Sequence, residues 1–354
     1  MPGVLPGARK PGGSDFEGQG QALALASPRV MTPENALGAS MFESRQISSA
    51  DPLIEGLEGP WFDVFRTIAG LSHFRGATYT PRVFDPRTYT PRPDELAGRV
   101  VAVTGASDGL GRAVALACAQ HGGSVVLVGR NEKKLEAVHA EIAALAAPEA
   151  AIGVLDLERA LAADYDRLAA ALDERYGRLD GLLHNAALLG RLSPIEHYDV
   201  PTWCRVLHVN LTAAFALTQV LLPLLKRSAD ASVVFTSSSV GRRGRAYWGA
   251  YAVSKFALEG LSQVLADELE GTSAIRVNTL NPGRARTAMR RQAYPAEDVA
   301  TVPSPATLTG PYIALLGPAS RGVTGGAFDA QPPASAAASD DRSSRSSPDS
   351  SSRA

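Results

Sequence analysis

A tyrosine and a lysine four residues apart are the side chains of this sequence best suited to proton transfer. Tyr251 and Lys255 begin a segment whose apolar residues recur at helical spacing, so both should lie on one face of a helix. An ammonium beside a phenol favours the phenolate, and we expect Lys255 to bring the tyrosine pKa from about 10 toward neutrality. Ser238 lies upstream at the end of an apolar strand, where its hydroxyl can hydrogen-bond the substrate oxygen that Tyr251 protonates.

By itself the pair is weak evidence, because among nine tyrosines such a spacing also arises by chance on a solvated helix face. A glycine-rich turn earlier in the chain strengthens the chemical interpretation. Gly105, Gly109 and Gly111 stand in TGASDGLG, between an apolar strand and a helix. Such a turn sets backbone N–H groups and a helix N-terminus against a pyrophosphate. A plain tight turn is the alternative, and the second strand–helix unit that follows favours a nucleotide site.

Three more residues follow predicted strands near the same nucleotide. Asp156 comes after the third strand, where it either accepts from an adenine amino group or caps a helix N-terminus. Asn185 and Ala186 end the fourth strand. Because the carboxyl ends of parallel strands line the ligand crevice of such sheets, we assign both to cofactor binding.

Strands alternate with helices from residue 99 to residue 331. This alternation requires crossover connections, and hence a parallel sheet with helices on both faces. We therefore predict an α/β fold: a single Rossmann-type, doubly wound parallel sheet of about seven strands. The predicted strands cover residues 100–103, 124–128, 151–155, 181–185, 232–237, 275–280 and 326–330, and the clearest helices cover 112–121, 132–145, 202–226 and 251–270.

Composition divides the chain into three parts. Residues 1–94 are rich in Gly, Pro, Ser and Ala, and we expect a mostly disordered or linker extension with a short amphipathic helix near 60–73. Residues 95–333 carry the alternation of strands and helices and form the predicted Rossmann domain. Residues 334–354 are rich in Ser, Asp and Arg, which cannot bury a core, so a disordered tail is expected.

Overall composition favours a cytoplasmic protein. The formal net charge is −1, so no overall field indicates a nucleic-acid binder. No uninterrupted apolar run reaches the roughly 18 residues of a membrane span, so we expect no membrane association. The two cysteines have no partners at metal-ligand spacing, so no metal site is expected.

Several short motifs occur in the order and approximate spacing of the compact branch of the short-chain dehydrogenase/reductase family. The resemblance covers about residues 94–331, and Ala187 departs from it because the family usually has glycine there. Within the family, GRNEKKL, TSSSVGRRGRAYWGAYAVSKFALEG and FDAQP look like the YciK-type bacterial oxidoreductases. The segments that carry the family resemblance are TGASDGLG, HNAA at 184–187, Asn210, Ser238, Tyr251, Lys255 and NPGRART at 281–287.

The resemblance implies a role for each residue of the proton-transfer site. Tyr251 would be the general acid of carbonyl reduction or the base of alcohol oxidation, and Lys255 would lower its pKa and hold the nicotinamide ribose. Ser238 would orient and polarise the substrate oxygen. Asn210 would hold a water that links Lys255 to bulk solvent, or else brace a helix. The predicted function is an NAD(P)-dependent oxidoreductase that transfers hydride between a nicotinamide cofactor and a carbonyl/alcohol substrate.

The residue after the second strand favours NADP(H) over NAD(H), which stays the second option. Arg130 stands where enzymes that use NAD carry a carboxylate for the ribose hydroxyls. An arginine offers a bidentate fork to a phosphate, whereas the charge of Asp108 would oppose one. The other residues assigned to the cofactor are Ser107 and Leu110 in the turn, and Pro282, Gly283 and Thr287 near the nicotinamide.

Two other functions compete with this one. A non-catalytic nucleotide-binding scaffold or redox sensor is disfavoured because it needs neither Tyr251 nor Lys255. A sugar epimerase or dehydratase is disfavoured by the glycine spacing and by the lack of a separate substrate domain. The expected partners are a small-molecule carbonyl or alcohol and further copies of the chain. A homodimer or homotetramer would form through the helices at 202–226 and 251–270, whose apolar residues exceed what one face needs.

Basic residues near the predicted mouth of the site leave the charge of the substrate open. They form either a solvated basic loop or a site for a phosphate or carboxylate, and in the second case the preference for anions should weaken with salt. These residues are Arg242, Arg243, Arg245, Arg284, Arg286, Arg290 and Arg291.

Overall fold

The computed structural model describes residues 84–145 and 147–332. The helix predicted near residues 60–73 and the tail predicted at 334–354 lie outside the described residues.

The described part begins before the domain boundary predicted at residue 95. Phe84 meets Phe328 edge-on, with the ring centroids 5.7 Å apart. The Tyr89 hydroxyl donates to the buried Glu95 carboxylate at 2.6 Å. The described residues before 95 therefore pack on the domain.

Seven parallel strands form one sheet, in the order β3-β2-β1-β4-β5-β6-β7. The first reads VVAVT and is buried throughout, as is typical of a parallel strand covered on both faces. The sheet confirms the predicted α/β fold. Its strands are β1 (Val100–Thr104), β2 (Ser124–Gly129), β3 (Ala151–Val154), β4 (Gly181–His184), β5 (Ser232–Thr236), β6 (Arg276–Asn281) and β7 (Ala327–Asp329).

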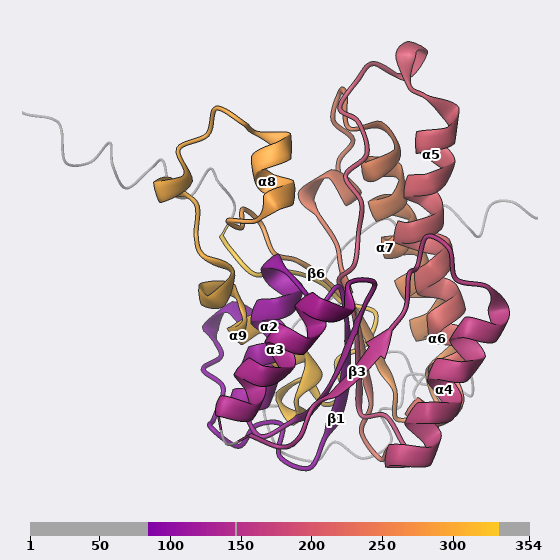
Figure 1. The fold of residues 1–354 in the computed structure, drawn as a ribbon, viewed down its shortest axis with the longest axis vertical. Helices are drawn as coiled ribbons and strands as arrows, with labels where there is room; N and C mark the ends of the chain where they lie inside the picture. The colour runs from indigo at the N-terminus through magenta and orange to yellow at the C-terminus, as the bar shows by residue number, and fades with distance from the viewer. Residues whose placement is uncertain (1–83, 146, 333–354) are drawn as a thin grey trace, which may run out of the picture. The chain divides into compact units, whose positions relative to one another are not determined.

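Helices cover both faces of the sheet (Figure 1). Along β1, Val101 and Val103 point into one core cluster, and Val100 and Ala102 point into the other. The first cluster lies under α2 (Gly109–Gln120), α3 (Glu132–Ala144) and α9 (Gly310–Leu316). The second lies under α4 (Ala162–Tyr176), α6 (Ala213–Lys226) and α7 (Gly249–Leu269).

The strand order creates the crevice at the edge where the strands end. After β3 the chain crosses to the opposite side of β1 and forms β4. The loops that follow β1 and β4 therefore leave neighbouring strands in different directions, which opens a crevice between them. The glycine-rich turn after β1 and Asn185 after β4 consequently lie side by side.

The helix predicted at residues 202–226 contains a π-helical turn. α5 (Val200–Leu207) begins at Asp199, whose carboxylate accepts from Thr202 N at 2.8 Å. A π-helical turn, His208–Thr212, follows before α6 begins. The predicted helical run is therefore present, from Val200 to Lys226, but it contains a π turn, and insertions of this kind often mark functional sites. Asn210 lies in the π turn and is 1% exposed.

By length and composition alone, the run Val200–Lys226 is apolar enough to cross a membrane. In the fold, its α6 part packs Leu217, Leu221 and Leu225 into the core beside the sheet. A core helix of a globular domain passes the same compositional criterion, so the apolar run has a structural explanation here.

Candidate active site

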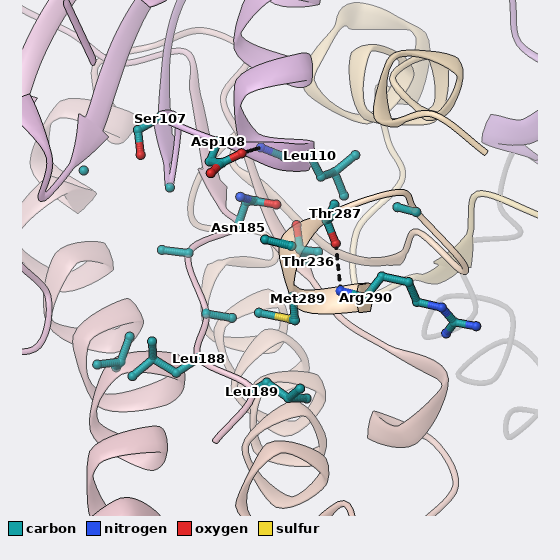
Figure 2. Close-up of a pocket in the computed structure, with 18 of the residues that line it drawn as sticks. Ser107, Asp108, Leu110, Asn185, Leu188, Leu189, Thr236, Thr287, Met289 and Arg290 are labelled. Atoms are coloured by element: carbon teal, nitrogen blue, oxygen red, sulfur yellow. Dashed lines mark hydrogen bonds between the residues drawn. The ribbon is translucent and has the colours of Figure 1, made fainter. Parts of the chain in front are cut away.

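A cavity of about 490 Å³ lies at the carboxyl ends of the strands. Figure 2 shows part of it, where Ser107, Asn185, Thr236 and Thr287 converge from four segments of the chain. All predicted site residues line the cavity except Gly111 and Asn210. The structure therefore brings the predicted proton-transfer residues and the glycine-rich turn into one site.

The glycine-rich turn has a shape that only glycine allows. Gly105 and Gly109 adopt φ angles of +68° and +54°, in the left-handed region. Gly111 has an ordinary φ, but a Cβ there would collide with the Gly105 carbonyl oxygen and the Asn185 amide nitrogen. The turn thus leaves its backbone open to a ligand at the start of α2, which fits a pyrophosphate.

Thr104 holds the turn to the neighbouring strand. Its hydroxyl oxygen accepts from the backbone N–H groups of Asn185 and Ala186, at 2.9 and 3.1 Å. The Asn185 amide donates to the Thr104 carbonyl at 3.2 Å. Asn185 therefore braces the junction of β1 and β4 as well as lining the cavity. Sequence reasoning missed Thr104, although a hydroxyl at a strand end beside the glycines is a usable signal.

Charged side chains gather where β2 and β3 end, a region that we call the β3 end of the cavity. Arg130 is exposed and lies 3.6 Å from the Glu158 carboxylate. Asp108 caps α2 by accepting from Gly109 N at 2.7 Å and pairs with Lys134 at 3.0 Å. The positive charge of Lys134 offsets the negative charge of Asp108. The sequence analysis did not assign Lys134 to the site, although this residue lies in the GRNEKKL motif.

Asp156 also lies at the β3 end, and it does not cap a helix. Its carboxylate accepts from Glu158 N at 3.1 Å, within a turn that precedes α4. The N-cap residue of α4 is Leu161. Of the two roles considered for Asp156, the cap is therefore wrong, and its side chain lines the cavity.

Tyr251 and Lys255 lie together in the first turns of α7, 8% and 2% exposed. The ammonium lies 5.6 Å from the centre of the Tyr251 ring and donates to the Thr236 carbonyl at 2.7 Å. Ser238 follows β5 and hydrogen-bonds with the Tyr251 side chain. The end of β5 thus positions both partners of the tyrosine.

Burial dominates the acidity of both side chains. It raises the pKa of Tyr251 to about 12, while the hydrogen bond with Ser238 acts in the opposite direction. It also lowers the pKa of Lys255 to about 8, which Glu259 partly offsets. The expectation that Lys255 brings the Tyr251 pKa toward neutrality was wrong for this state of the protein, because removal from water outweighs the nearby charge.

Asn210 makes three hydrogen bonds within the protein. Its amide oxygen accepts from Leu188 N at 2.7 Å, and its nitrogen donates to the Leu188 carbonyl at 2.9 Å and to the Ser254 hydroxyl at 3.0 Å. The π turn is what aims this side chain at the loop after β4. Asn210 therefore ties that loop to α7, a structural role close to the bracing alternative.

The loop after β6 closes the cavity. Thr287 caps α8 (Ala288–Ala293) by accepting from Arg290 N at 3.1 Å, and it packs beside Gly109 of the turn (Figure 2). Gly283 adopts a φ of +71°, and the Gln331 amide donates to the Pro282 carbonyl at 2.6 Å. These contacts hold the loop across the crevice.

The far part of the cavity is apolar, and we call it the α8 end. The sequence analysis did not name the residues of this end. Trp248 was recognisable, because it stands three residues before Tyr251 and so shares its helix face. The others come from loops whose approach depends on tertiary structure. The α8 end is lined by Leu189, Trp248, Met289, Ala293 and Tyr294, together with Arg290, whose guanidinium pairs with Glu297. Among the residues that the structure describes, no cluster of His, Cys, Asp or Glu side chains suits a metal ion.

The family model for short chain dehydrogenases matches residues 99–298. Among curated proteins, the uncharacterized oxidoreductase YciK of Escherichia coli strain K12 is 49% identical over 244 residues, which cover 69% of this chain and 96% of YciK.

Solved structures agree with this comparison. A short chain dehydrogenase from Shigella flexneri 2a strain 301, complexed with NADP, is 48% identical with a TM-score of 0.67, covering 68% of this chain and 100% of the other. One from Escherichia coli CFT073, complexed with NADPH, is 50% identical with a TM-score of 0.67 and the same coverage. Since the family model, the sequence relative and the folds agree, this chain belongs to the short-chain dehydrogenase/reductase family and is an oxidoreductase similar to YciK.

Proposed function

We propose that this protein interconverts a carbonyl compound and the corresponding alcohol with NADP(H), and that Tyr251 is its general acid and base. One observation carries the proposal: Tyr251 and Lys255 are buried together in the same cavity as the glycine-rich turn. A nucleotide-binding scaffold or redox sensor needs neither buried side chain, so the geometry favours catalysis.

The protonation states suit carbonyl reduction. With a pKa of about 12, the Tyr251 phenol holds its proton at neutral pH and can give it to the substrate oxygen as negative charge develops there. The Ser238 hydroxyl orients that oxygen. Lys255 is mostly charged below pH 8, and its ammonium favours the phenolate that remains after proton transfer. In alcohol oxidation the same groups work in reverse.

The cavity fits a dinucleotide along its length. The turn and the start of α2 would hold the pyrophosphate, Asp156 would accept from the adenine, and Lys255 with the 282–287 loop would hold the nicotinamide end. When bound, NADPH supplies the hydride that adds to the carbonyl carbon, which with the Tyr251 proton gives the alcohol and NADP⁺. The protein then regains its proton from solvent, and Asn210 keeps the loop beside Lys255 in place.

NADP(H) is the cofactor that the charges favour. Arg130 is exposed beside the cavity, where its guanidinium can form a bidentate contact with a 2′-phosphate. The Asp108 carboxylate, which would repel that phosphate, is neutralised by Lys134. The relatives solved with NADP and NADPH support the same choice.

We place the enzyme in the cytoplasm.

Tyr251→Phe tests the proposal because it removes only the transferable proton. We expect the variant to lose more than nine-tenths of its turnover of a ketone, while NADPH binds within a few-fold of wild type. Oxidation of NADPH by a panel of ketones measures turnover, and fluorescence titration measures binding.

Tyr165→Phe is the matched control. It removes a hydroxyl from a buried tyrosine of α4 that does not line the cavity, so turnover should stay near wild type. More than a tenth of wild-type turnover in Tyr251→Phe would show that another group donates the proton.

A further inference from the structure

The α8 end of the cavity has an aromatic wall. Trp248 lies between Tyr251 and Tyr294, with ring centroids 5.8 and 6.0 Å away. Leu189 and Met289 line the same end of the cavity (Figure 2 labels both). The substrate carbon next to the reacting carbonyl would therefore meet rings, a thioether and aliphatic groups.

A strained backbone aims Trp248 at this position. The residue before it, Tyr247, has a φ of +73°, which is uncommon for a side chain of this size. Its carbonyl accepts from Ser193 N at 3.0 Å. Gly249 follows with a φ of +34°, and a Cβ there would collide with the ring of Tyr198. Two contacts with the segment between β4 and α5 thus hold the indole against the cavity, and strain of this kind tends to persist at functional sites.

The two arginines nearest this end already have partners, a carboxylate for Arg290 and aromatic groups for Arg245. Arg290 forms two bonds of 2.6 Å with the Glu297 carboxylate and stacks on Tyr294, and in Figure 2 its guanidinium points away from Met289. Arg245 donates to the Tyr294 hydroxyl at 2.6 Å and lies over Trp248.

The other arginines are no better placed to bind an anion. Arg242 is held by Glu259 and Asp329 at 3.0 and 3.1 Å. Of the remaining four, Arg284 lies 3.7 Å from Glu297, and Arg286 donates to the Val302 carbonyl at 3.2 Å. The last two, Arg243 and Arg291, are exposed and do not line the cavity.

We propose that the substrate is a neutral ketone, or the matching alcohol, whose apolar body packs on Trp248 and Tyr294. This inference rests on the proposed carbonyl–alcohol chemistry and narrows its substrate class. A carboxylate at the α8 end would lose its hydration, and the arginine that lines this end, Arg290, is already paired with Glu297, whereas Arg245 does not line the cavity. Burying that charge costs far more than burying a hydrocarbon group of the same shape. An aromatic or branched aliphatic group there gains from leaving water.

Two neutral ketones and one ketone that carries a carboxylate test the inference, and the first neutral ketone has nearly the same shape as the anion. 5-Methyl-2-hexanone carries an isopropyl group where 4-oxopentanoate carries a carboxylate, and 4-phenyl-2-butanone carries a ring at the same place. We expect the Tyr251→Phe variant with NADPH to bind each neutral ketone about tenfold or more tightly than the anion. Calorimetric titration measures this without requiring turnover. In wild type, kcat/KM should rank the three compounds in the same way at low and high salt.

Removing the indole tests the contact itself. Trp248→Ala should raise KM for 4-phenyl-2-butanone about tenfold while kcat changes much less, since the ring lies beside the reacting atoms and takes no proton. Tyr176→Ala is the control, because that ring belongs to α4 and does not line the cavity. Its KM should stay at the wild-type value.

The outcomes separate the two proposals. Equal or tighter binding of 4-oxopentanoate, or an anion preference that weakens with salt, overturns the apolar subsite while carbonyl reduction stands. Selective binding of the neutral ketones by a wild-type protein that reduces none of them supports the subsite and overturns carbonyl reduction.

Discussion

Lys255 is subject to two influences that act on its pKa in opposite directions. Burial lowers the pKa from 10.5 to about 8, and the Glu259 carboxylate, one turn further along α7, raises it. Glu259 in turn accepts hydrogen bonds from Ser237, Thr279 and Arg242, at 2.5, 2.7 and 3.0 Å. The charge of the lysine therefore depends on a carboxylate that lies outside the cavity.

Carbonyl reduction should decline as pH rises through about 8. Lys255 loses its proton there, whereas Tyr251, with a pKa of about 12, stays protonated. Because Glu259 raises the lysine pKa, Glu259→Gln should move the midpoint of the decline to lower pH. The measurement is kcat/KM for a neutral ketone between about pH 6 and pH 10.

Glu268→Gln is the control for this profile, because that exposed carboxylate lies further along the same helix and should leave the midpoint in place. An unchanged or higher midpoint in Glu259→Gln would contradict the coupling between Glu259 and Lys255.

At the scale of elements, the glycine-rich turn is where β1, α2 and the loop after β4 meet. Gly111 has no positive φ, so its backbone conformation does not require glycine. Packing does, since a Cβ there would collide with the Gly105 carbonyl and the Asn185 side chain. Asn185 is fixed by its bond to the Thr104 carbonyl and has little room to move. The close approach of α2 to the sheet therefore requires a residue without a side chain at position 111.

Gly111→Ala should displace the Asn185 side chain and widen the turn. We expect the free energy of unfolding to fall by about 1–3 kcal/mol, as in other overpacked sites, and NADPH affinity to fall about tenfold. Thermal unfolding and fluorescence titration check both effects. Gly244→Ala serves as the control, because its added methyl would meet no atom within 4 Å. A Gly111→Ala variant with wild-type Tm and NADPH affinity would show that the turn adapts.

At the scale of the whole molecule, α6 and α7 carry apolar side chains on their outer faces. Phe215 of α6 is 48% exposed, and Val253, Phe256 and Val264 recur on one side of α7 with between 44% and 57% exposure. Large exposed apolar side chains gathered on two helices are typical of an interface between copies of a chain. This observation supports the homodimer or homotetramer expected from the sequence.

The double variant Phe215→Glu/Phe256→Glu should be monomeric, because it sets like charges into a face that association would bury. Light scattering at micromolar concentration should show a dimer or tetramer for wild type and a monomer for the variant. Ile195→Glu is the control, since it changes an equally apolar exposed residue outside α6 and α7. A wild-type chain that is monomeric under these conditions would contradict the prediction.

Local patterns were enough to predict much of this protein. Apolar runs of strand length mark the seven strands to within a few residues, because a parallel strand covered on both faces has few polar positions. The spacing of Gly105, Gly109 and Gly111 and that of Tyr251 and Lys255 are also local. Both depend on a single turn or a single helix, so the sequence alone was enough to predict the glycine-rich turn and to place Tyr251 beside Lys255.

Tertiary structure decided whatever depends on contacts between distant segments. The strand order brings Asn185 against the turn, and the π turn directs Asn210 to a loop that no helical periodicity reveals. Burial is what raises the pKa of Tyr251. A sequence shows charged neighbours more readily than it shows which side chains are removed from water. From the sequence, the arginines near the mouth of the site look like a basic loop. In the fold, Arg290, Arg242 and Arg245 contact Glu297, Glu259 and Tyr294, respectively. Pairing over such separations depends on the fold, so the sequence alone could not show that these arginines already have partners.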